Sequence, residues 1–148
     1  MIISVGSDHA GLHLKLDLVE HLTTLGFAID DVGTHGPESC DYPDFAIAVA
    51  RKVASGVAHM GLLVCGTGQG MVMTANKVAG VRAAVVLDTF SARMARLHNN
   101  ANVLCLGERV VGAGLARDIV DVWLSAEFEG GRHQRRVNKI DALGPDLS

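Results

Sequence analysis

Residues 61–70 read Gly61-Leu62-Leu63-Val64-Cys65-Gly66-Thr67-Gly68-Gln69-Gly70, an apolar run that ends in a cysteine and three alternating glycines. The apolar run predicts a buried β-strand. The glycines allow the chain to turn sharply and bring backbone N–H groups close to an anion. Residues 71–76 predict the first turns of a helix, whose N-terminal dipole favours negative charge in the loop. That field favours the thiolate of Cys65, the form that takes a proton or attacks carbon.

Standard phosphate-binding motifs do not match this loop. The dinucleotide fingerprint G-x-G-x-x-G needs a glycine where this chain has Met71, and a Walker loop needs a Gly-Lys-Ser/Thr group that is absent here. A phosphotyrosine-type phosphatase needs an arginine six residues after its cysteine, which is again the position of Met71. Taken alone, the loop is explained equally well by an anion-binding turn and by a buried structural cysteine before a glycine-rich turn.

The composition is that of one globular domain covering residues 1–148. The chain is 49% hydrophobic and has few aromatic residues, so its core is expected to consist of aliphatic side chains. Its formal net charge of -3 gives no general affinity for nucleic acid or for an acidic membrane surface. Any anion that it binds must therefore be held locally.

Three cysteines at positions 40, 65 and 105 form no C-x-x-C pair. This pattern indicates a reducing compartment and neither a disulfide framework nor a zinc site. The apolar start is soon followed by Asp8, so it predicts a first strand and not a signal peptide, and we expect a cytoplasmic protein. Residues 53–76 lack Asp, Glu, Lys and Arg, but five glycines interrupt them, so we interpret them as helix end, strand and loop.

Strand and helix patterns alternate along the chain without internal repeats or linkers. Such repeated βα units predict an α/β fold: a single-domain, Rossmann-like three-layer αβα sandwich with a five-stranded parallel sheet. The predicted strands cover residues 2–6, 27–30, 61–64, 83–87 and 103–106, and the predicted helices cover 11–25, 43–56, 71–76, 88–97 and 112–124.

Ligands of such folds bind where parallel strands end, so the residues after each strand are site candidates. They are Asp8-His9, residues 65–70, Asp88 and residues 107–109. Asp88 is also suited to cap the helix that follows it. Further candidates are residues 98–100 and the basic segment 132–136. In that segment Arg132 and Arg136 would share one face of a helix and could grip a phosphate together.

At these positions the chain resembles the ribose-5-phosphate isomerase B family, which includes the related galactose-6-phosphate isomerase subunits. The resemblance runs from residue 6 to residue 136 and rests on Gly6-Ser7-Asp8-His9-Ala10-Gly11, Asp41-Tyr42-Pro43, residues 65–70, Ala75-Asn76-Lys77, His98-Asn99, Gly107-Glu108-Arg109-Val110-Val111-Gly112 and Phe128-Glu129-Gly130-Gly131-Arg132-His133.

The resemblance implies an aldose–ketose isomerase that works through a cis-enediolate, without a metal or an organic cofactor. Carried over by position, Cys65 is the base that moves a proton between C1 and C2. Thr67 and the amides of Gly66, Gly68, Gln69 and Gly70 would stabilise the enediolate oxygen, and His98, helped by Asp8, would open the furanose ring. The family also has a branch with a glutamate base after the glycine loop, but residues 71–75 contain no carboxylate here.

The resemblance also implies where the sugar phosphate binds and how the protein assembles. His9, Arg132 and Arg136 would hold the phosphate. Asn99 and Arg109 would complete the sugar and phosphate contacts, and Tyr42 would line the pocket. The family forms homodimers with a shared active site, and pairing of dimers into tetramers stays open.

Other interpretations remain. The enzyme could act on a hexose 6-phosphate, such as allose 6-phosphate or galactose 6-phosphate, and a non-catalytic flavin- or nucleotide-binding module would also explain the fold and the anion loop. His9 and His13 are four residues apart and could form a metal pair, although further ligands are missing. Cys105 is expected in the core.

Overall fold

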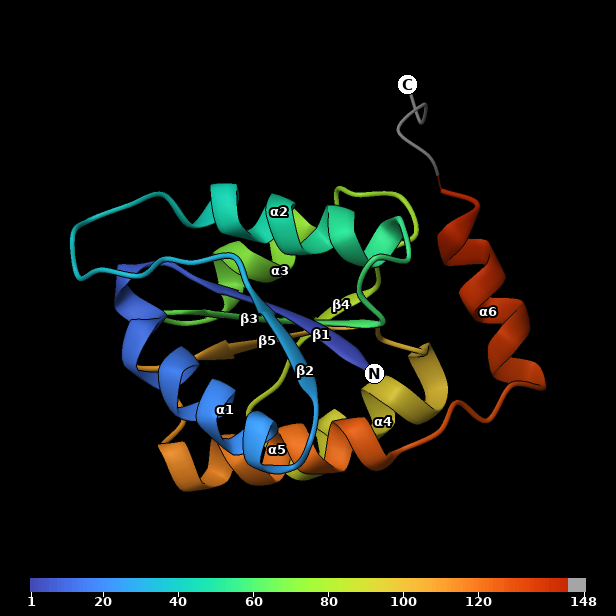
Figure 1. Cartoon of the computed structure of the whole chain (residues 1–148). Coiled ribbons are helices and arrows are strands. Elements are labelled where there is room, and N and C mark those ends of the chain that lie inside the picture. The colour runs from blue at the N-terminus through green and yellow to red at the C-terminus, as the bar shows by residue number, and fades with distance from the viewer. Residues whose placement is uncertain (144–148) are drawn as a thin grey trace.

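The chain forms a five-stranded parallel sheet with the strand order β2-β1-β3-β5-β4 (Figure 1). The computed structural model describes residues 1–143. The strands are β1 (Ile2–Ser7), β2 (Ala28–Asp31), β3 (Met60–Cys65), β4 (Ala83–Val85) and β5 (Val103–Gly107). The predicted α/β class and the five parallel strands are confirmed.

Within residues 1–143, four α-helices connect successive strands and two follow β5. They are α1 (Leu12–Thr24), α2 (Tyr42–Ala54), α3 (Gln69–Ala75), α4 (Thr89–Asn99), α5 (Ala113–Ser125) and α6 (Arg132–Asp141), with a short 3-10 turn at His9–Gly11. Most predicted boundaries differ from the observed ones by one or two residues, and three differences stand out. Residues 9–11 form the 3-10 turn, so the first α-helix begins after them. The helix after the glycine loop begins at Gln69, and β4 ends at Val85.

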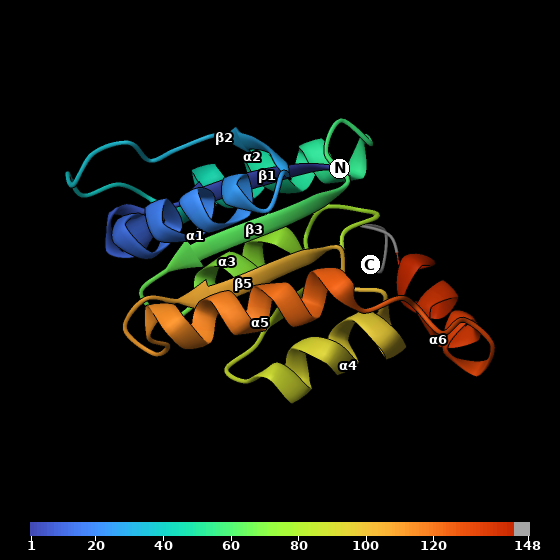
Figure 2. The same cartoon turned by 60° about the horizontal axis from the view of Figure 1, so that its bottom comes forward.

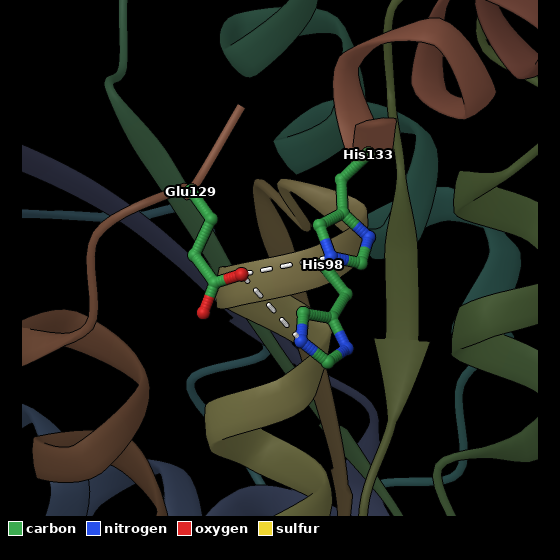
Figure 3. A group of neighbouring side chains, drawn as sticks. All are labelled: His98, Glu129 and His133. Carbon is green, nitrogen blue, oxygen red and sulfur yellow. Dashed lines mark ion pairs between the residues drawn. The ribbon is translucent and has the colours of Figure 1, made fainter. Parts of the chain in front are cut away.

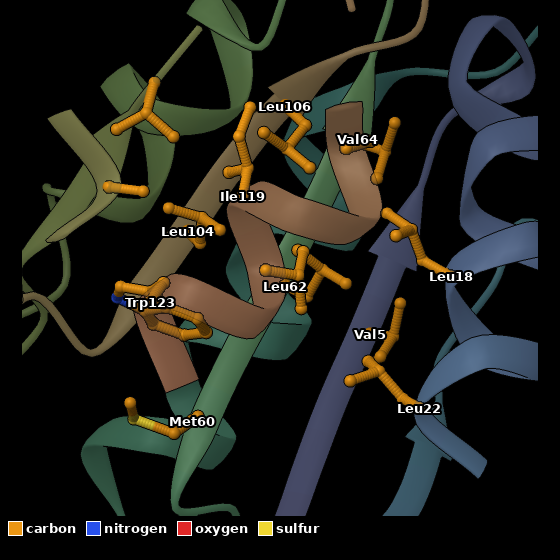
Figure 4. Packing of buried hydrophobic residues seen from close by; sticks show 14 of the residues in the cluster. Val5, Leu18, Leu22, Met60, Leu62, Val64, Leu104, Leu106, Ile119 and Trp123 are labelled. Carbon is orange, nitrogen blue, oxygen red and sulfur yellow. The ribbon is translucent and has the colours of Figure 1, made fainter. Parts of the chain in front are cut away.

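The sheet lies between two helical layers. Helices α2 and α3 cover one face, and α1, α4 and α5 cover the other (Figures 1 and 2). A core cluster lies on each face, and the larger one packs Trp123 of α5 and Leu18 of α1 against Leu62 and Leu104 of the sheet (Figure 4). All of β3 is buried, as expected for a central strand covered on both faces.

The strand order reverses direction beside β1. From β1 the chain adds β2 on one side and then crosses to place β3 on the other. Ligands of open α/β sheets bind at the carboxyl edge of such a switch point. Here Asp8 follows β1 and Cys65 ends β3, and the two segments touch because the Asp8 N–H donates to the Val64 carbonyl at 3.3 Å.

The C-terminal helix α6 does not join the two layers. It lies beyond the amino ends of the strands, next to the end of α4 (Figures 1 and 2). An ion pair of 2.9 Å between Asp141 and Arg82, just before β4, holds it there. Among the described residues, no helix is long and apolar enough to cross a membrane.

A fully buried lysine fixes the loop after β2. The Lys15 ammonium contacts both carboxylate oxygens of Asp31 at 2.7 and 2.8 Å and the Thr34 carbonyl at 2.7 Å. Asp31 also accepts from the Gly33 N–H. This lysine anchors α1 to the chain beside the carboxyl edge of the sheet.

Lys15→Met should lower the free energy of unfolding by about 3 kcal/mol, because it leaves a partly buried carboxylate and a carbonyl without their partner. Urea unfolding measures the loss. The matched control is Lys52→Met, whose pair with Asp30 is 36% exposed on both sides and should contribute less than about 1 kcal/mol. Equal losses in the two variants would contradict this account of Lys15.

Candidate active site

Cys65 lies at the carboxyl end of the central strand and faces a backbone donor. Its side chain is 5% exposed, and the Gly68 N–H donates to its Sγ at 3.1 Å. Gly68 has φ +79°, a left-handed conformation that a glycine adopts readily. The turn thus directs an N–H group back at the sulfur just before α3 begins, and an amide in this position favours negative charge on Sγ.

The glycine loop packs tightly against the end of β5. A Cβ on Gly107 would lie 2.7 Å from the Thr67 backbone, so only a glycine lets the loop approach this closely. The Arg109 N–H donates to the Gly66 carbonyl at 3.1 Å, and the Arg109 side chain lies over Gly66. The structure therefore brings three predicted site residues into contact at the end of β5: Gly66, Thr67 and Arg109.

The other side of the glycine loop contacts Tyr42. A Cβ on Gly70 would overlap the Tyr42 ring, which extends from the first turn of α2. Thr67 and Gln69 expose their side chains, and the Thr67 hydroxyl accepts from the Gln69 N–H at 3.4 Å. Tyr42 and Gln69 thus lie at the mouth of the predicted site.

Asp8 and His9 stand beside this loop at the end of β1. The Asp8 carboxylate is largely buried and caps the 3-10 turn by accepting from Ala10 and Gly11 at 3.0 and 3.1 Å. The His9 Nδ1 accepts from the Cys40 N–H at 3.2 Å. A neutral His9 ring must then carry its proton on Nε2, where it is suited to donate to a phosphate oxygen.

The remaining predicted site residues lie at the opposite edge of the sheet. Helix α4 starts after β4 at the carboxyl edge and runs back over 11 residues, about 16 Å, so His98 and Asn99 reach the amino edge. Arg132 and Arg136 lie on α6 at the same edge (Figure 2). The prediction that Arg132 and Arg136 share a helix is confirmed. These candidates lie away from the strand-end candidates because the crossover helix α4 returns the chain to the amino edge of the sheet.

His98 belongs to a compact cluster with Glu129 and His133 (Figure 3). The two imidazole rings stack with their centroids 4.1 Å apart and their planes 5° from parallel. Both Nε2 atoms face the same Glu129 oxygen, at 3.9 Å from His98 and 3.5 Å from His133. The Arg132 Nε–H donates to the Nε2 of His133 at 3.4 Å.

Loss of solvent lowers the pKa of His133, and the charges of His98 and Arg132 lower it further, while Glu129 opposes them. His133 is therefore favoured as the neutral ring.

This pair of histidines and a carboxylate offers three potential metal ligands, but its geometry does not suit a metal. Parallel stacked rings direct their lone pairs side by side and not toward one point, and Arg132 already occupies one of them.

His9 and His13 do not form the metal pair that their spacing suggested. The two residues lie in different elements, and the His9 Nδ1 accepts a hydrogen bond from the Cys40 N–H.

Cys105 is fully buried, and burial raises the pKa of its thiol, as expected for a core cysteine. Asp88 caps α4 by accepting from the Ser91 N–H at 2.7 Å, which confirms its predicted structural role.

Comparison with known proteins fits this geometry. Residues 3–140 match the family model described as Ribose/Galactose Isomerase. The chain is 50% identical to ribose-5-phosphate isomerase B of Escherichia coli over 95% of both chains. The chain belongs to the ribose/galactose isomerase family. The resemblance inferred from the sequence motifs is thereby confirmed.

Solved structures agree closely with this fold. Ribose-5-phosphate isomerase B of Clostridium thermocellum superposes with a TM-score of 0.95 at 55% identity, over 96% of both chains. Ribose-5-phosphate isomerase B of Mycoplasma genitalium, solved with bound ribulose-5-phosphate, superposes with a TM-score of 0.93 at 50% identity, over 95% of this chain and 94% of that one.

Two further residues lie within the candidate segments 107–109 and 132–136 but received no role from the sequence. Glu108 follows β5, and its carboxylate accepts from the Leu14 N–H at 2.9 Å, so it caps the first turn of α1. His133 was quoted only within a motif and the basic segment, although a histidine next to Arg132 and four residues after Glu129 was a visible signal. Its stacking partner lies too far along the chain for spacing to show.

Gly107→Ala tests the close approach of the glycine loop. The added Cβ meets backbone, which cannot rotate away, so we expect the Thr67 loop to shift and kcat/KM to fall by about tenfold or more, as for a 1 Å displacement of catalytic groups. A coupled assay measures this loss. Gly112→Ala is the control, since its Cβ would meet open space. Full activity in Gly107→Ala would show that the loop does not depend on this contact.

Proposed function

We propose that this chain interconverts D-ribose 5-phosphate and D-ribulose 5-phosphate with Cys65 as the base. The observation that carries the proposal is the Cys65 sulfur held beside the Gly68 N–H at the carboxyl edge of the sheet. Membership of the ribose/galactose isomerase family supports the reaction class. The ribulose-5-phosphate bound to the Mycoplasma genitalium relative supports the substrate.

The reaction moves one proton between neighbouring carbons. From the open-chain aldose, the Cys65 thiolate takes the C2 proton, and the electron pair of the C–H bond forms the enediolate with the negative charge on O1. The hydroxyl proton of O2 then passes to O1, C2=O forms, and the proton held by Cys65 returns to C1. Thr67 and the amides of residues 66–70 stabilise the negative oxygen, where a single well-placed donor contributes about 3 kcal/mol. Proton transfer by a side chain fits a reaction that needs no redox partner.

Ring opening must precede the proton transfer when the substrate is a furanose. We assign this step to His98, assisted by Asp8. His98 accepts the proton of the anomeric hydroxyl as C1=O forms and the ring C–O bond breaks, and a proton is returned to the ring oxygen. His98 is about one-third exposed, and its ring is therefore accessible to a sugar.

The phosphate is held by His9, Arg132 and Arg136, and Asn99 and Arg109 complete the sugar and phosphate contacts. Among the described residues, no ion pair involves Arg132, Arg136 or Arg109. Their guanidinium groups are thus available for an anionic ligand, although the chain as a whole is negatively charged.

A second copy of the chain completes each site, so that Cys65 of one copy works with His98 of the other. The separation of these residues at opposite edges of the sheet supports this assembly, since neither edge alone offers both. Exposed apolar side chains near the Cys65 edge offer a contact surface, because Met73 of α3 and Phe90 of α4 are 65% and 71% exposed.

Mixed assemblies test the shared site. Cys65→Ala and His98→Asn chains, each inactive alone, are co-expressed with different tags and purified on both. The mixed dimer then contains one intact site of two and should show about half of the wild-type turnover of ribose 5-phosphate.

The matched control for the mixed dimer pairs Cys65→Ala with a Cys65→Ala/His98→Asn double variant, which leaves no intact site. No recovery in the first pair would show that Cys65 and His98 act within one chain. More than about a tenth of wild-type turnover in Cys65→Ala alone would overturn the base assignment.

Substitution of an arginine on α6 tests the proposed phosphate contacts. A charge-assisted contact contributes about 1.5–3 kcal/mol, so Arg136→Ala should lower kcat/KM for ribose 5-phosphate by about 10- to 100-fold. Arg135→Ala is the control, since this neighbour lies on the same helix and is not assigned to the phosphate. Unphosphorylated ribose should be a poor substrate of the wild-type enzyme.

The family description also names galactose isomerases, so a hexose 6-phosphate remains the alternative substrate. Parallel assays with allose 6-phosphate and galactose 6-phosphate decide between them. A higher kcat/KM for a hexose 6-phosphate than for ribose 5-phosphate would assign the enzyme to the longer sugar and reject the pentose proposal.

A further inference from the structure

We propose that His133 and Glu129 form a seat that positions the His98 ring for opening the sugar. This inference rests on the proposed role of His98 in the isomerase and adds two residues that act through it. His133 lies in the first turn of α6 and Glu129 in the loop before that helix, whereas His98 ends α4. Three separate segments thus converge on one imidazole (Figure 3).

Stacking holds the plane of the His98 ring. His133 is only 6% exposed, so its ring is a fixed surface, whereas the His98 side chain is 37% exposed. The rings are parallel within 5° at a centroid distance of 4.1 Å. Without His133, the His98 side chain at a helix end would be free to adopt other rotamers.

Hydrogen bonding decides which ring can take part in proton transfer. The Nε2 of His133 accepts from Arg132 at 3.4 Å, so this ring is neutral with its proton on Nδ1. The charged groups that face His133 are Glu129, Arg132 and Arg136, together with His98, and burial is the largest factor that keeps it neutral. His133 is therefore the neutral partner, and we assign the proton transfer with the sugar to His98.

Glu129 favours one rotation of the His98 ring within its plane. Its carboxylate oxygen lies 3.9 Å from the His98 Nε2 and 3.5 Å from the His133 Nε2, so it attracts both positions without a direct hydrogen bond. Because the His133 Nε2 is the acceptor for Arg132, a proton on the Nε2 of His98 is the one that this carboxylate can favour. The opposite nitrogen of His98, Nδ1, is then the one that accepts the proton of the anomeric hydroxyl. The Glu129 backbone is itself fixed, since its N–H donates to the Leu97 carbonyl at 3.0 Å.

Two kinetic measurements separate positioning from a general structural role. Turnover of ribose 5-phosphate needs ring opening. Solvent deuterium exchange at C1 of ribulose 5-phosphate, which has no furanose ring, needs Cys65 but not ring opening. His133→Ala should lower kcat for ribose 5-phosphate by about tenfold and change KM and the deuterium exchange by less than about twofold.

Conservative variants sharpen the test. His133→Phe keeps a flat ring against His98 and should recover turnover to within about threefold of wild type. Glu129→Gln, at an exposed side chain, should lower turnover by about threefold to tenfold without loss of exchange, and it carries the test if His133→Ala does not fold. The controls are His21→Ala and Asp121→Asn, which disrupt a similar histidine–carboxylate pair of 2.7 Å between α1 and α5.

The outcomes separate this inference from the proposed function. Equal losses of turnover and exchange in His133→Ala, or unchanged turnover in both His133→Ala and Glu129→Gln, would overturn the positioning role. Full exchange in Cys65→Ala would instead overturn the base assignment and leave the seat untouched. Nitrogen-15 NMR at neutral pH adds an independent check: a protonated Nε2 on His133 contradicts the seat, and an unprotonated Nε2 with a protonated Nδ1 supports it.

Discussion

A helix that connects two parallel strands carries the chain from the carboxyl edge of the sheet back to the amino edge, where the next strand begins. In this protein α4 leaves the carboxyl edge after β4 and brings His98 to the amino edge, about 16 Å away along the helix. Cys65 stays at the carboxyl edge because it ends β3. The topology therefore divides these groups of one chain between two edges, and this separation is the reason for proposing that the site combines the edges of two copies.

At the carboxyl edge, backbone atoms contribute directly to the electrostatics around Cys65. The Gly68 amide faces the Cys65 sulfur, and the turn can approach β5 because Gly107 has no Cβ. Such donors are fixed before substrate arrives, so they cost no reorganisation when charge develops on a sugar oxygen. This explains how a chain with a formal net charge of -3 can stabilise an anion at a single point.

The features that could be predicted from sequence depend on local patterns. The apolar run 60–65, the glycines after it and the Asp88 cap each act over a few residues, and the alternation of such units sufficed for the parallel sheet. Contacts between distant segments left no such pattern. The pair of Lys15 with Asp31 and the stack of His98 on His133 depend on how elements meet in space. The edge reached by α4 was predictable in principle, since helix length and strand direction determine it.

The charges around His98 bear on the proton transfer that we propose for it. A lone histidine pair would repel a second proton, but it would leave open which ring carries the first. Arg132 removes that ambiguity by donating to His133, and Glu129 offsets the positive potential that Arg132 and Arg136 create. The same arginine is assigned to the phosphate, so binding of the substrate and the proton distribution of the histidine pair share one side chain. A substrate phosphate that draws Arg132 away would weaken the contact of Arg132 with His133. Ring opening would then depend on how the phosphate is bound.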